Sequence, residues 1–316
     1  MPETYDIAII GGGPAGLTAG LYASRARMRT ILLEKAICGG QIVTTDTIEN
    51  FPGFPDGIKG PELADWMLKQ ASHFGLEVRP AEAGGLILKD KENEPFVIEL
   101  TDGARLEALS VIISTGAAWN SLGIPGEKEL TGRGVSYCAT CDGPIFRGKD
   151  VAVIGGGDTA LEDALFLAKF AAKVTIVHRR DRFRGAKILQ ERVFANSKIE
   201  VCFNSVATGI TGAGKCEALE IKDVKTDAAR SIKVSGVFVL IGMIPNSGIF
   251  KAVIKTDSKG YILCDDDMKT SLDGVFACGD VRNKLLRQVV TAAGDGATAA
   301  FSAQHYVERI KGVEYK

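Results

Sequence analysis

The sequence predicts an α/β protein that contains two copies of one unit, in which a buried strand, a glycine-rich turn, a helix and a second strand follow one another. The first copy begins with the apolar run 5–10, and the second begins with the run 151–154. Each run leads directly into a cluster of glycines, and small residues then recur at steps of three or four. Because the order of features is the same in both copies, we expect two α/β domains of similar construction.

Length and composition limit the class of protein. The chain has 316 residues, of which 46% are hydrophobic, which is enough for two domains with their own cores. Lys and Arg number 38 against 39 Asp and Glu, so a nucleic-acid-binding surface is not expected. No apolar run approaches the roughly 20 residues of a membrane span, and the first residues do not resemble a secretory signal. We therefore expect a soluble, cytoplasmic protein.

The first glycine turn follows a predicted strand over Tyr5–Ile10 and precedes a helix predicted to run to about Arg27. A second strand is predicted over 30–33 and ends at Glu34. The turn fits G-x-G-x-x-G, in which the first glycine allows a tight turn, the second lets a pyrophosphate approach, and the third lets helix and strand pack closely. The candidate binding residues here are Gly11, Gly13, Pro14, Ala15 and Gly16.

The second copy starts from a predicted strand over 151–154 and fits G-x-G-x-x-A. Its helix is predicted to run to about Phe170, and its second strand covers 174–177 and ends at His178. The candidate binding residues are Gly155, Gly157, Asp158, Thr159 and Ala160. One such motif could be an ordinary glycine turn. Two, each between a strand and a helix, favour two dinucleotide sites of Rossmann type.

One position distinguishes the two sites. From Gly11 to Glu34 is 23 positions, the same as from Gly155 to His178. An acid at this position accepts hydrogen bonds from ribose hydroxyls and repels a 2′-phosphate. The first site is therefore predicted to bind an adenosine with a free ribose, whereas the second is not restricted in this way.

A basic run follows the second strand, and it includes Arg179, Arg180 and Arg184. Guanidinium groups bind phosphate in fork geometry, so together with His178 these residues are predicted to bind the 2′-phosphate of NADPH. The alternative is a basic loop that only faces solvent. Two dinucleotides in one chain suggest FAD in the first site and NADPH in the second, with the flavin receiving hydride.

Of seven cysteines, only Cys138 and Cys141 are close in sequence. A zinc site would need further cysteine or histidine ligands at suitable spacing, so no metal is expected. Two buried, inert cysteines are the other alternative. A redox pair is favoured because this spacing at a helical turn brings two sulfurs within bonding range. Thiol–disulfide exchange also needs proton transfer, for which the adjacent Asp142 is the candidate.

These features together resemble the low-molecular-weight thioredoxin reductases, and the resemblance extends over essentially the whole chain. Its most specific parts are the strings C-A-T-C-D-G at 138–143 and H-R-R-x-x-x-R at 178–184. The resemblance implies a discontinuous FAD domain formed by 1–115 and 247–316, with an NADPH domain over 116–246 inserted in it. It also implies a homodimer and thioredoxin as the protein substrate.

The resemblance assigns further residues to FAD. Besides Glu34 and the first glycine turn, they are Gly40, Gln41, Asn50, Thr115, Gly116, Gly279, Asp280, Arg287, Gln288 and Val289. Asp280 is expected at the end of a strand, and the last helix is expected to start in 291–300. Cys278 is expected to be a packed small residue.

The resemblance also implies a division of labour between the thiols. Cys141 receives electrons from the flavin, Cys138 attacks the thioredoxin disulfide, and Asp142 acts as acid and base. A hinge between the domains is expected at 117–120 and 244–246. Where some relatives carry two aromatic residues that dock thioredoxin, this chain has Ile145-Phe146, so these two residues and Arg133 are the docking candidates.

Other functions remain open at this point. A dithiol oxidase on the same fold would keep FAD and the cysteine pair but would have no use for the arginines. A ferredoxin–NADP reductase of the same superfamily would lack the cysteine pair. A flavoprotein that reduces another thioredoxin-like carrier for a peroxidase system would keep every motif. A non-catalytic binding module would need neither two nucleotide sites nor a dithiol.

Overall fold

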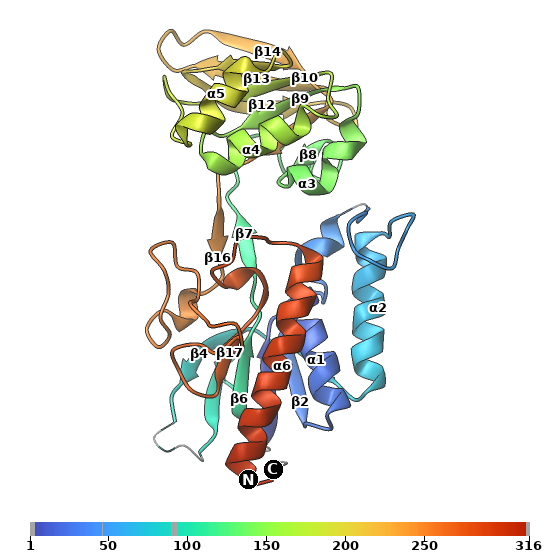
Figure 1. Cartoon of the computed structure of the whole chain (residues 1–316), viewed down its shortest axis with the longest axis vertical. Helices are drawn as coiled ribbons and strands as arrows, with labels where there is room; N and C mark the ends of the chain where they lie inside the picture. The colour runs from blue at the N-terminus through green and yellow to red at the C-terminus, as the bar shows by residue number, and fades with distance from the viewer. Residues whose placement is uncertain (1–3, 46, 90, 92–93, 314–316) are drawn as a thin grey trace. The chain divides into compact units, whose positions relative to one another are not determined.

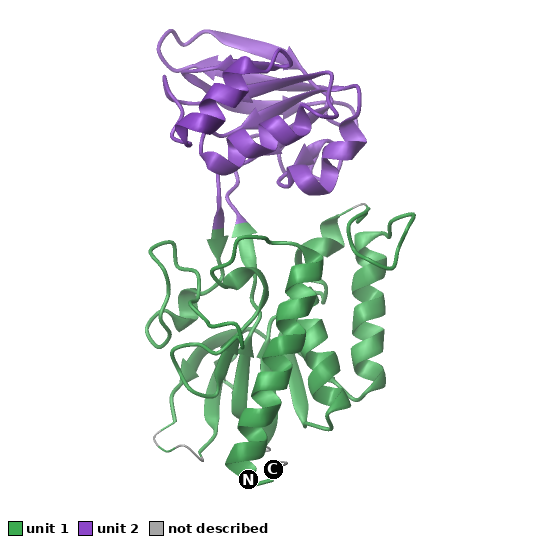
Figure 2. Ribbon diagram, viewed as in Figure 1, with its two compact units in different colours: residues 1–118, 244–316 green, residues 119–243 purple. Residues whose placement is uncertain are grey.

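The computed structural model describes residues 4–45, 47–89, 91 and 94–313 (Figure 1). The chain divides into two compact units (Figure 2). Unit 1 comprises Met1–Ala118 and Ile244–Lys316, and unit 2 comprises Trp119–Met243. Unit 2 is thus inserted into unit 1, and it is slightly shorter at both ends than the insertion 116–246 expected from the sequence.

Unit 1 is built on a seven-stranded sheet with the order β3-β2-β1-β6-β5-β4, and β17 pairs with the C-terminal end of β6. The strands β3, β2, β1, β6 and β17 are parallel, whereas β4 and β5 are antiparallel to their neighbours. The strands are β1 Thr4–Ile10, β2 Thr30–Glu34, β3 Glu77–Pro80, β4 Ala83–Ile87, β5 Phe96–Leu100, β6 Arg105–Ile113 and β17 Val275–Ala277. The helices are α1 Pro14–Arg25, η1 Gly40–Thr44, α2 Gly60–His73, η3 Gly248–Phe250, η4 Gly279–Val281 and α6 Val289–Lys311.

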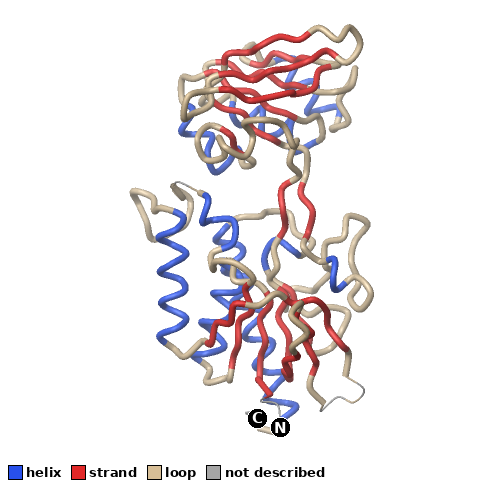
Figure 3. Tube along the Cα trace, turned by 180° about the vertical axis from the view of Figure 1, so that it is seen from behind, coloured by secondary structure: helices blue, strands red, loops and turns tan. Residues whose placement is uncertain are grey.

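Helices cover one face of this sheet, as the two opposite views show (Figures 1 and 3). On that face the small residues of α1 and α6 pack against the alternate strand residues Ile7 and Ile9. The close approach needs glycine, since a Cβ on Gly296 of α6 would collide with the backbone of Ala15 in α1. The other face of the sheet packs against the segment that contains Phe250 and Ile262.

Unit 2 has three layers. A five-stranded parallel sheet of order β11-β10-β9-β15-β8 lies between helices and a three-stranded antiparallel sheet, β12-β13-β14 (Figure 3). The strands are β8 Val135–Ser136, β9 Asp150–Ile154, β10 Lys173–Val177, β11 Ile199–Cys202, β12 Ser205–Thr211, β13 Ala218–Asp223, β14 Ala229–Lys233 and β15 Gly236–Val239. The helices are α3 Ala139–Asp142, η2 Gly143–Phe146, α4 Asp158–Leu167 and α5 Lys187–Ala195. The predicted α/β class, with two parallel sheets, is confirmed.

The two chain crossings between the units are β7 (Ala117–Trp119) and β16 (Met243–Pro245), which pair as a two-stranded sheet. Thr115 and Asn246 exchange hydrogen bonds at one end: Thr115 Oγ1 donates to the Asn246 carbonyl at 2.7 Å, and Asn246 Nδ2 donates to the Thr115 carbonyl at 2.8 Å. At the other end, the Asn120 N–H donates to the Gly242 carbonyl at 3.0 Å. The crossings therefore form one ribbon rather than two separate tethers.

Several predicted boundaries were wrong. Helix α1 ends at Arg25 rather than near Arg27, because Arg27 has a positive φ of 63° that a helix cannot contain. Helix α4 ends at Leu167 rather than near Phe170. Helix α6 begins at Val289, slightly before the predicted stretch 291–300. Within the described part of the chain, no helix is both long and apolar enough to cross a membrane.

Candidate active site

The first glycine turn joins β1 to α1 and has the conformation that its glycines allow. Gly11 has a φ of +110°, which residues with a side chain rarely adopt. A Cβ added at Gly11 would also collide with the Ser114 carbonyl oxygen, which would lie 2.5 Å from it. Helix α1 starts at Pro14 with Gly13 as its N-cap, so no side chain caps the helix end. A Cβ on Gly40 would lie 3.2 Å from the Cα of Gly13. Two stretches of bare backbone therefore meet at the helix N-terminus, which is a favourable site for an anion.

Glu34 lies at the end of β2, beside this turn. One carboxylate oxygen accepts a hydrogen bond from the Gly12 N–H at 2.7 Å, and the other accepts one from the Ala36 N–H at 3.0 Å. Each oxygen has a second lone pair, so the carboxylate can still accept bonds from a diol. The acid ends the second strand as predicted, and the structure adds that it lies against the glycine turn.

The second glycine turn joins β9 to α4 in the same way. Helix α4 begins at Asp158, with Gly157 as an N-cap that offers no side-chain cap, and Thr159 is exposed at its start. His178 lies beside Gly156 much as Glu34 lies beside Gly12: a Cβ on Gly156 would collide with the His178 ring, and a Cβ on Gly12 would lie 3.1 Å from Glu34 Oε2. Burial lowers the pKa of His178, which favours the neutral ring.

The basic run after β10 is exposed at Arg179, Arg180 and Arg184. The Arg184 N–H donates to the Gly156 carbonyl at 2.8 Å, and one guanidinium nitrogen of Arg184 lies 3.6 Å from the position of a Cβ on Gly157. The chain thus folds back on the glycine turn after the arginines. This fold brings Arg184 to the turn itself, while Arg179 and Arg180 stay at the end of the strand.

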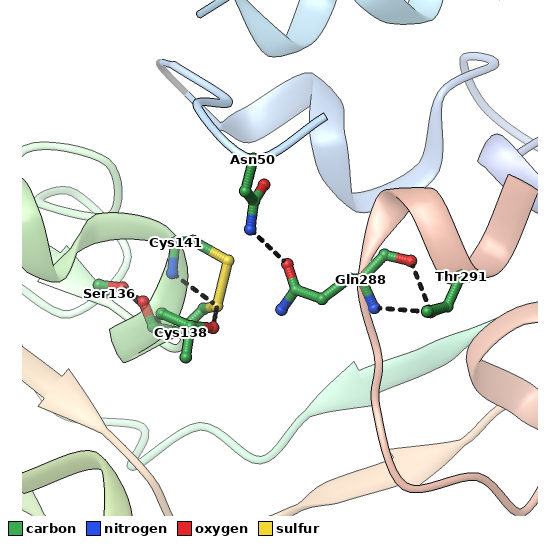
Figure 4. Close-up of a disulfide and its surroundings, with 7 residues drawn as sticks. Asn50, Ser136, Cys138, Cys141, Gln288 and Thr291 are labelled. Atoms are coloured by element: carbon green, nitrogen blue, oxygen red, sulfur yellow. Dashed lines mark hydrogen bonds between the residues drawn. A yellow bond between two sulfur atoms is a disulfide. The ribbon is translucent and has the colours of Figure 1, made fainter. Parts of the chain in front are cut away.

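The remaining residues of unit 1 that were assigned to FAD come from five separate segments, 40–41, 50, 115–116, 279–280 and 287–289. Asn50 Nδ2 donates to Gln288 Oε1 at 2.9 Å, and Gln288 also forms a reciprocal capping box with Thr291 at the start of α6 (Figure 4). Gln41 Nε2 donates to the Ala117 carbonyl. The Asn50–Gln288 hydrogen bond links the N-terminus of α6, which includes Val289, to the loop that contains Asn50.

Asp280 does not end a strand, contrary to prediction. Strand β17 stops at Ala277, and Asp280 lies in the single turn η4, because Gly279 adopts φ +74°. Asp280 Oδ1 is buried and has no hydrogen-bond partner among the described residues. Burial raises the pKa of this carboxyl group. Such an atom indicates a missing donor, since buried polar groups are normally hydrogen-bonded.

Arg287 lies beside Asp280 in the same region of unit 1. Its guanidinium carbon lies 4.2 Å from the centroid of the Tyr261 ring, and its Nε is a second buried atom without a partner in the described chain. Asp280 Oδ1 and Arg287 Nε are therefore an acceptor and a donor that no other described residue pairs with.

Sequence reasoning missed Asp295, which holds the Asp280 turn in place. Its carboxylate accepts bonds from the Gly279 N–H at 3.0 Å, Arg282 Nη1 at 3.0 Å and Lys284 Nζ at 2.7 Å. The signal was an acid within the otherwise small and apolar stretch 291–300, whose position on the buried side of a helix implies a partner. Cys278 is fully buried, and burial raises the pKa of its thiol strongly, as expected for a packed residue.

Cys138 and Cys141 form a disulfide at the start of α3, and their Cα atoms lie 5.4 Å apart (Figure 4). Cys138 is the N-cap of α3, and its sulfur accepts a hydrogen bond from the Cys141 N–H at 3.2 Å. Asp142 is the last residue of α3 and is half-buried. The predicted pairing of these two cysteines is confirmed. In the described chain, no cluster of three or more His, Cys, Asp or Glu could hold a metal ion.

Asp163, on α4, packs against the same short helix. Burial raises its pKa to about 6, while the backbone of Ala139 at the start of α3 acts in the opposite direction. The carboxyl group therefore lies against the backbone of the redox motif.

The docking candidates separate into two kinds. Ile145 is 47% exposed and Arg133 is also exposed. Phe146 is only 7% exposed: its ring meets that of Phe238 edge-on at 5.3 Å and fills the space above Gly236. Phe146 was a docking candidate for which buried packing was the alternative, and the structure favours the alternative, since its ring is part of the core of unit 2.

Comparisons with known proteins show the family to which the chain belongs. The family model described as "Pyridine nucleotide-disulphide oxidoreductase" matches residues 5–296. The thioredoxin reductase of Peptoclostridium acidaminophilum is 49% identical over 314 residues, which covers 98% of each chain. That of Bacillus subtilis (strain 168) is 46% identical over 310 residues, covering 98% of this chain and 96% of the relative. The crystal structure of thioredoxin reductase from Streptococcus pyogenes MGAS5005 matches with a TM-score of 0.93 at 45% identity, covering 98% of this chain and 100% of that one.

The chain therefore belongs to the pyridine nucleotide-disulphide oxidoreductase family. Within that family it is a low-molecular-weight thioredoxin reductase of the bacterial type, a thioredoxin-disulfide reductase of the flavoprotein class. The predicted family and enzyme class are confirmed.

Proposed function

We propose that unit 1 binds FAD, that unit 2 binds NADPH, and that electrons pass from NADPH through FAD and the Cys138–Cys141 disulfide to the disulfide of thioredoxin. The observation that supports the FAD assignment best is the unpaired, buried Oδ1 of Asp280. FAD carries a chain of hydroxyl groups, each of which can donate to such an oxygen. The residues of unit 1 therefore fit FAD.

The pyrophosphate of FAD would lie at the N-terminus of α1, against the bare backbone of Gly11, Gly13 and Gly40. Glu34 would accept hydrogen bonds from the adenosine ribose. Asp280 and Arg287 would face the part of FAD nearer the flavin. Bound FAD supplies the transfer of electron pairs between a nicotinamide and a disulfide.

Further contacts to FAD are assigned by the resemblance and supported by position. They are Pro14, Ala15 and Gly16 at the start of α1, Gln41 in η1, Asn50, Thr115 and Gly116 in loops, Gly279 in η4, and Gln288 and Val289 at the start of α6. Asn50 and Gln288 bond to each other, so a ligand that contacts one affects the other.

NADPH would bind the second glycine turn, through Gly155, Gly157 and the first residues of α4, which are Asp158, Thr159 and Ala160. The exposed Arg179 and Arg180 are free to turn toward a 2′-phosphate, and Arg184 lies closer to the pyrophosphate position. His178, kept neutral by burial, fills the place that Glu34 holds in unit 1 and adds no negative charge there.

At the dithiol, Cys141 would accept the electron pair, which breaks the S–S bond and gives two thiols after proton uptake. The Cys138 thiolate would then attack one sulfur of the partner disulfide, forming a mixed disulfide and releasing one partner thiolate. Asp142 would donate a proton to that leaving sulfur. Attack by Cys141 on the mixed disulfide releases the second partner thiol and restores the Cys138–Cys141 bond.

We also propose that the ribbon of β7 and β16 is the hinge for the exchange of substrates, since both chain crossings lie in it. Ile145 and Arg133 remain docking candidates because both are exposed. A homodimer is proposed on the resemblance alone. A cytoplasmic location is supported by five free cysteines beside one redox disulfide, a usage that fits a reducing compartment.

The test is a purified-protein assay with separate half-reactions. NADPH added under nitrogen should bleach the yellow flavin spectrum, and thioredoxin should then be reduced with turnover. The Cys138→Ser variant should keep flavin reduction and lose thioredoxin reduction. If the purified protein cannot be loaded with flavin, the assignment of unit 1 is wrong. If NADPH does not reduce the flavin under nitrogen, whereas a dithiol substrate reduces it and oxygen then reoxidises it, the chain is a dithiol oxidase.

A further inference from the structure

Glu127 is a buried carboxylate in unit 2, and one of its hydrogen-bond donors is Tyr137, the residue directly before the disulfide. It is only 3% exposed. It accepts bonds from the Leu122 N–H at 2.9 Å, the Gly123 N–H at 2.8 Å and the Tyr137 hydroxyl at 2.9 Å. A buried carboxylate is costly unless its oxygens are hydrogen-bonded, so these three neutral donors fix its position. In turn, the carboxylate fixes the tip of the Tyr137 side chain.

Tyr137 is held at its ring face as well. Its ring stacks on that of Trp119, with centroids 5.8 Å apart and planes at 17°. Burial, followed by the bond to Glu127, raises the pKa of Tyr137 to about 12. The phenol therefore stays protonated, and stays a donor to Glu127, over the whole range in which a thiol enzyme works.

Tyr137 directly precedes Cys138. The backbone of Cys138 is bracketed by Ser136, whose Oγ accepts from the Cys138 N–H at 3.1 Å and donates to the Cys138 carbonyl at 3.3 Å (Figure 4). Cys138 is extended, with φ −142° and ψ 104°. Tyr137 itself lies at a bend, directly before Cys138. Holding its ring through Trp119 and Glu127 therefore restrains the backbone from which the Cys138 side chain leaves.

We propose that Glu127 and Trp119, acting through Tyr137, are positioning residues for Cys138 and hold its sulfur aligned with that of Cys141. The inference rests on the proposed function, in which this thiol pair carries the electrons. The closing of a disulfide depends on the effective concentration of one thiol at the other, and alignment raises that concentration. Loosening Tyr137 should therefore weaken disulfide formation without changing the chemistry of either sulfur.

Trp119 belongs to a crossing strand and also contacts the residue that precedes the redox motif. Trp119 ends β7, the first crossing strand, so the stacked pair connects that strand to the redox motif within unit 2. The alignment of Cys138 is accordingly predicted to depend on a residue that is distant from it in sequence and carries no redox chemistry.

The test measures the thiol–disulfide equilibrium directly. Holoenzyme is equilibrated under nitrogen with oxidised and reduced glutathione, without nicotinamide, then quenched in acid, alkylated and analysed by mass spectrometry. In this exchange the enzyme dithiol and one oxidised glutathione give the enzyme disulfide and two reduced glutathiones. Tyr137→Phe and Trp119→Ala should each lower the equilibrium constant about three- to tenfold, the size expected for one net contact. Tenfold corresponds to a reduction potential about 30 mV higher.

Conservative and matched variants separate positioning from a general loss of structure. Trp119→Phe keeps an aromatic ring on Tyr137 and should stay within about twofold of the parent, which is less than a hydrogen bond is worth. Tyr22→Phe on α1, where the ring is 45% exposed, removes the same hydroxyl group elsewhere and should change nothing. Glu127→Gln combined with Tyr137→Phe should shift the equilibrium no further than the larger single change, because both act on one bond.

An unchanged glutathione equilibrium in Tyr137→Phe, with the protein folded and flavin bound, would overturn the proposal. Tyr137→Phe decides the matter even where Trp119→Ala does not fold. The measurement uses neither NADPH nor thioredoxin. If the proposed electron path is wrong, NADPH will fail to drive the parent enzyme, whereas the glutathione equilibrium can still be read.

Discussion

Asp295 provides the sharpest test of the energetics in unit 1. It accepts bonds from two cations, Arg282 and Lys284, and the three side chains are only 12%, 13% and 9% exposed, respectively. Replacing Asp295 with Asn keeps the shape and removes the charge. Two largely buried cations then lose this counter-charge, and the amide places an N–H donor at a position where one of the two oxygens accepted a hydrogen bond.

The expected loss in the free energy of unfolding is large, although only one oxygen is replaced by an amide nitrogen. Breaking a buried ion pair by removing one partner costs about 3–5 kcal/mol, because the remaining charge stays desolvated. Asp267→Asn is the matched control. Asp267 bonds to Lys269 at 2.9 Å, nearly the same length, but the two side chains are 64% and 55% exposed. An exposed pair of this kind contributes about 0–1 kcal/mol.

The measurement is urea unfolding followed by tryptophan fluorescence. The chain has two tryptophans, and only Trp66, in α2, belongs to unit 1. A Trp119→Phe background therefore leaves one reporter for the unit that contains Asp295. FAD affinity should fall in the same variant, because Asp295 also holds the Gly279 N–H beside Asp280. Release of flavin on dilution gives a second, independent reading.

Two results would contradict this reasoning about Asp295. If Asp295→Asn and Asp267→Asn destabilise unit 1 by amounts that differ by less than about 1 kcal/mol, burial does not decide the value of these ion pairs. If Asp295→Asn destabilises the protein but leaves FAD affinity intact, the turn at Asp280 does not depend on this carboxylate.

Three further outcomes are expected. Arg179→Ala combined with Arg180→Ala should raise the Michaelis constant for NADPH about 100-fold and leave that for NADH nearly unchanged, since each charged contact contributes about 1.5 kcal/mol; equal effects would mean that neither side chain binds the phosphate. Because the pKa of Asp163 is raised to about 6 by burial, the folded state binds its proton more tightly, and stability should fall as pH rises from about 4 to about 6; Asp163→Asn should remove up to about 3 kcal/mol of that pH dependence in urea titrations. Phe146→Ala should destabilise unit 2 by about 3–5 kcal/mol, whereas Ile145→Ala should leave stability nearly unchanged and raise the Michaelis constant for thioredoxin if that surface binds it.

The local motifs could be predicted because their physics is local. The turns at Gly11 and Gly155 need particular backbone angles at fixed offsets, and a strand and a helix on either side complete the pattern. Counting alone put Glu34 and His178 at equivalent positions in the two copies, whereas their contacts with the glycine turns are seen only in the structure. The disulfide between Cys138 and Cys141 followed from a spacing of one helical turn.

Features that depend on tertiary contacts could not be predicted in the same way. Whether Phe146 is exposed depends on Phe238, which is far along the chain, so its position beside the redox pair was misleading. Asp280 was placed at a strand end because the apolar run continues to Cys278, whereas the positive φ of Gly279 turns the chain first. Glu127 gave no signal, because its partner Tyr137 is reached only through the fold.

The pairing of β7 with β16 has a consequence for protein engineering. The chain leaves unit 1 and returns to it through two adjacent, hydrogen-bonded strands, so the two cut ends created by deleting 119–243 would already be neighbours. A short loop joining Ala118 to Ile244 would then close a flavin-binding module, and 119–243 could be produced as a separate nicotinamide-binding module. A gene that encodes each half alone is therefore a reasonable starting point for building hybrid reductases, in which one half is exchanged for that of another enzyme.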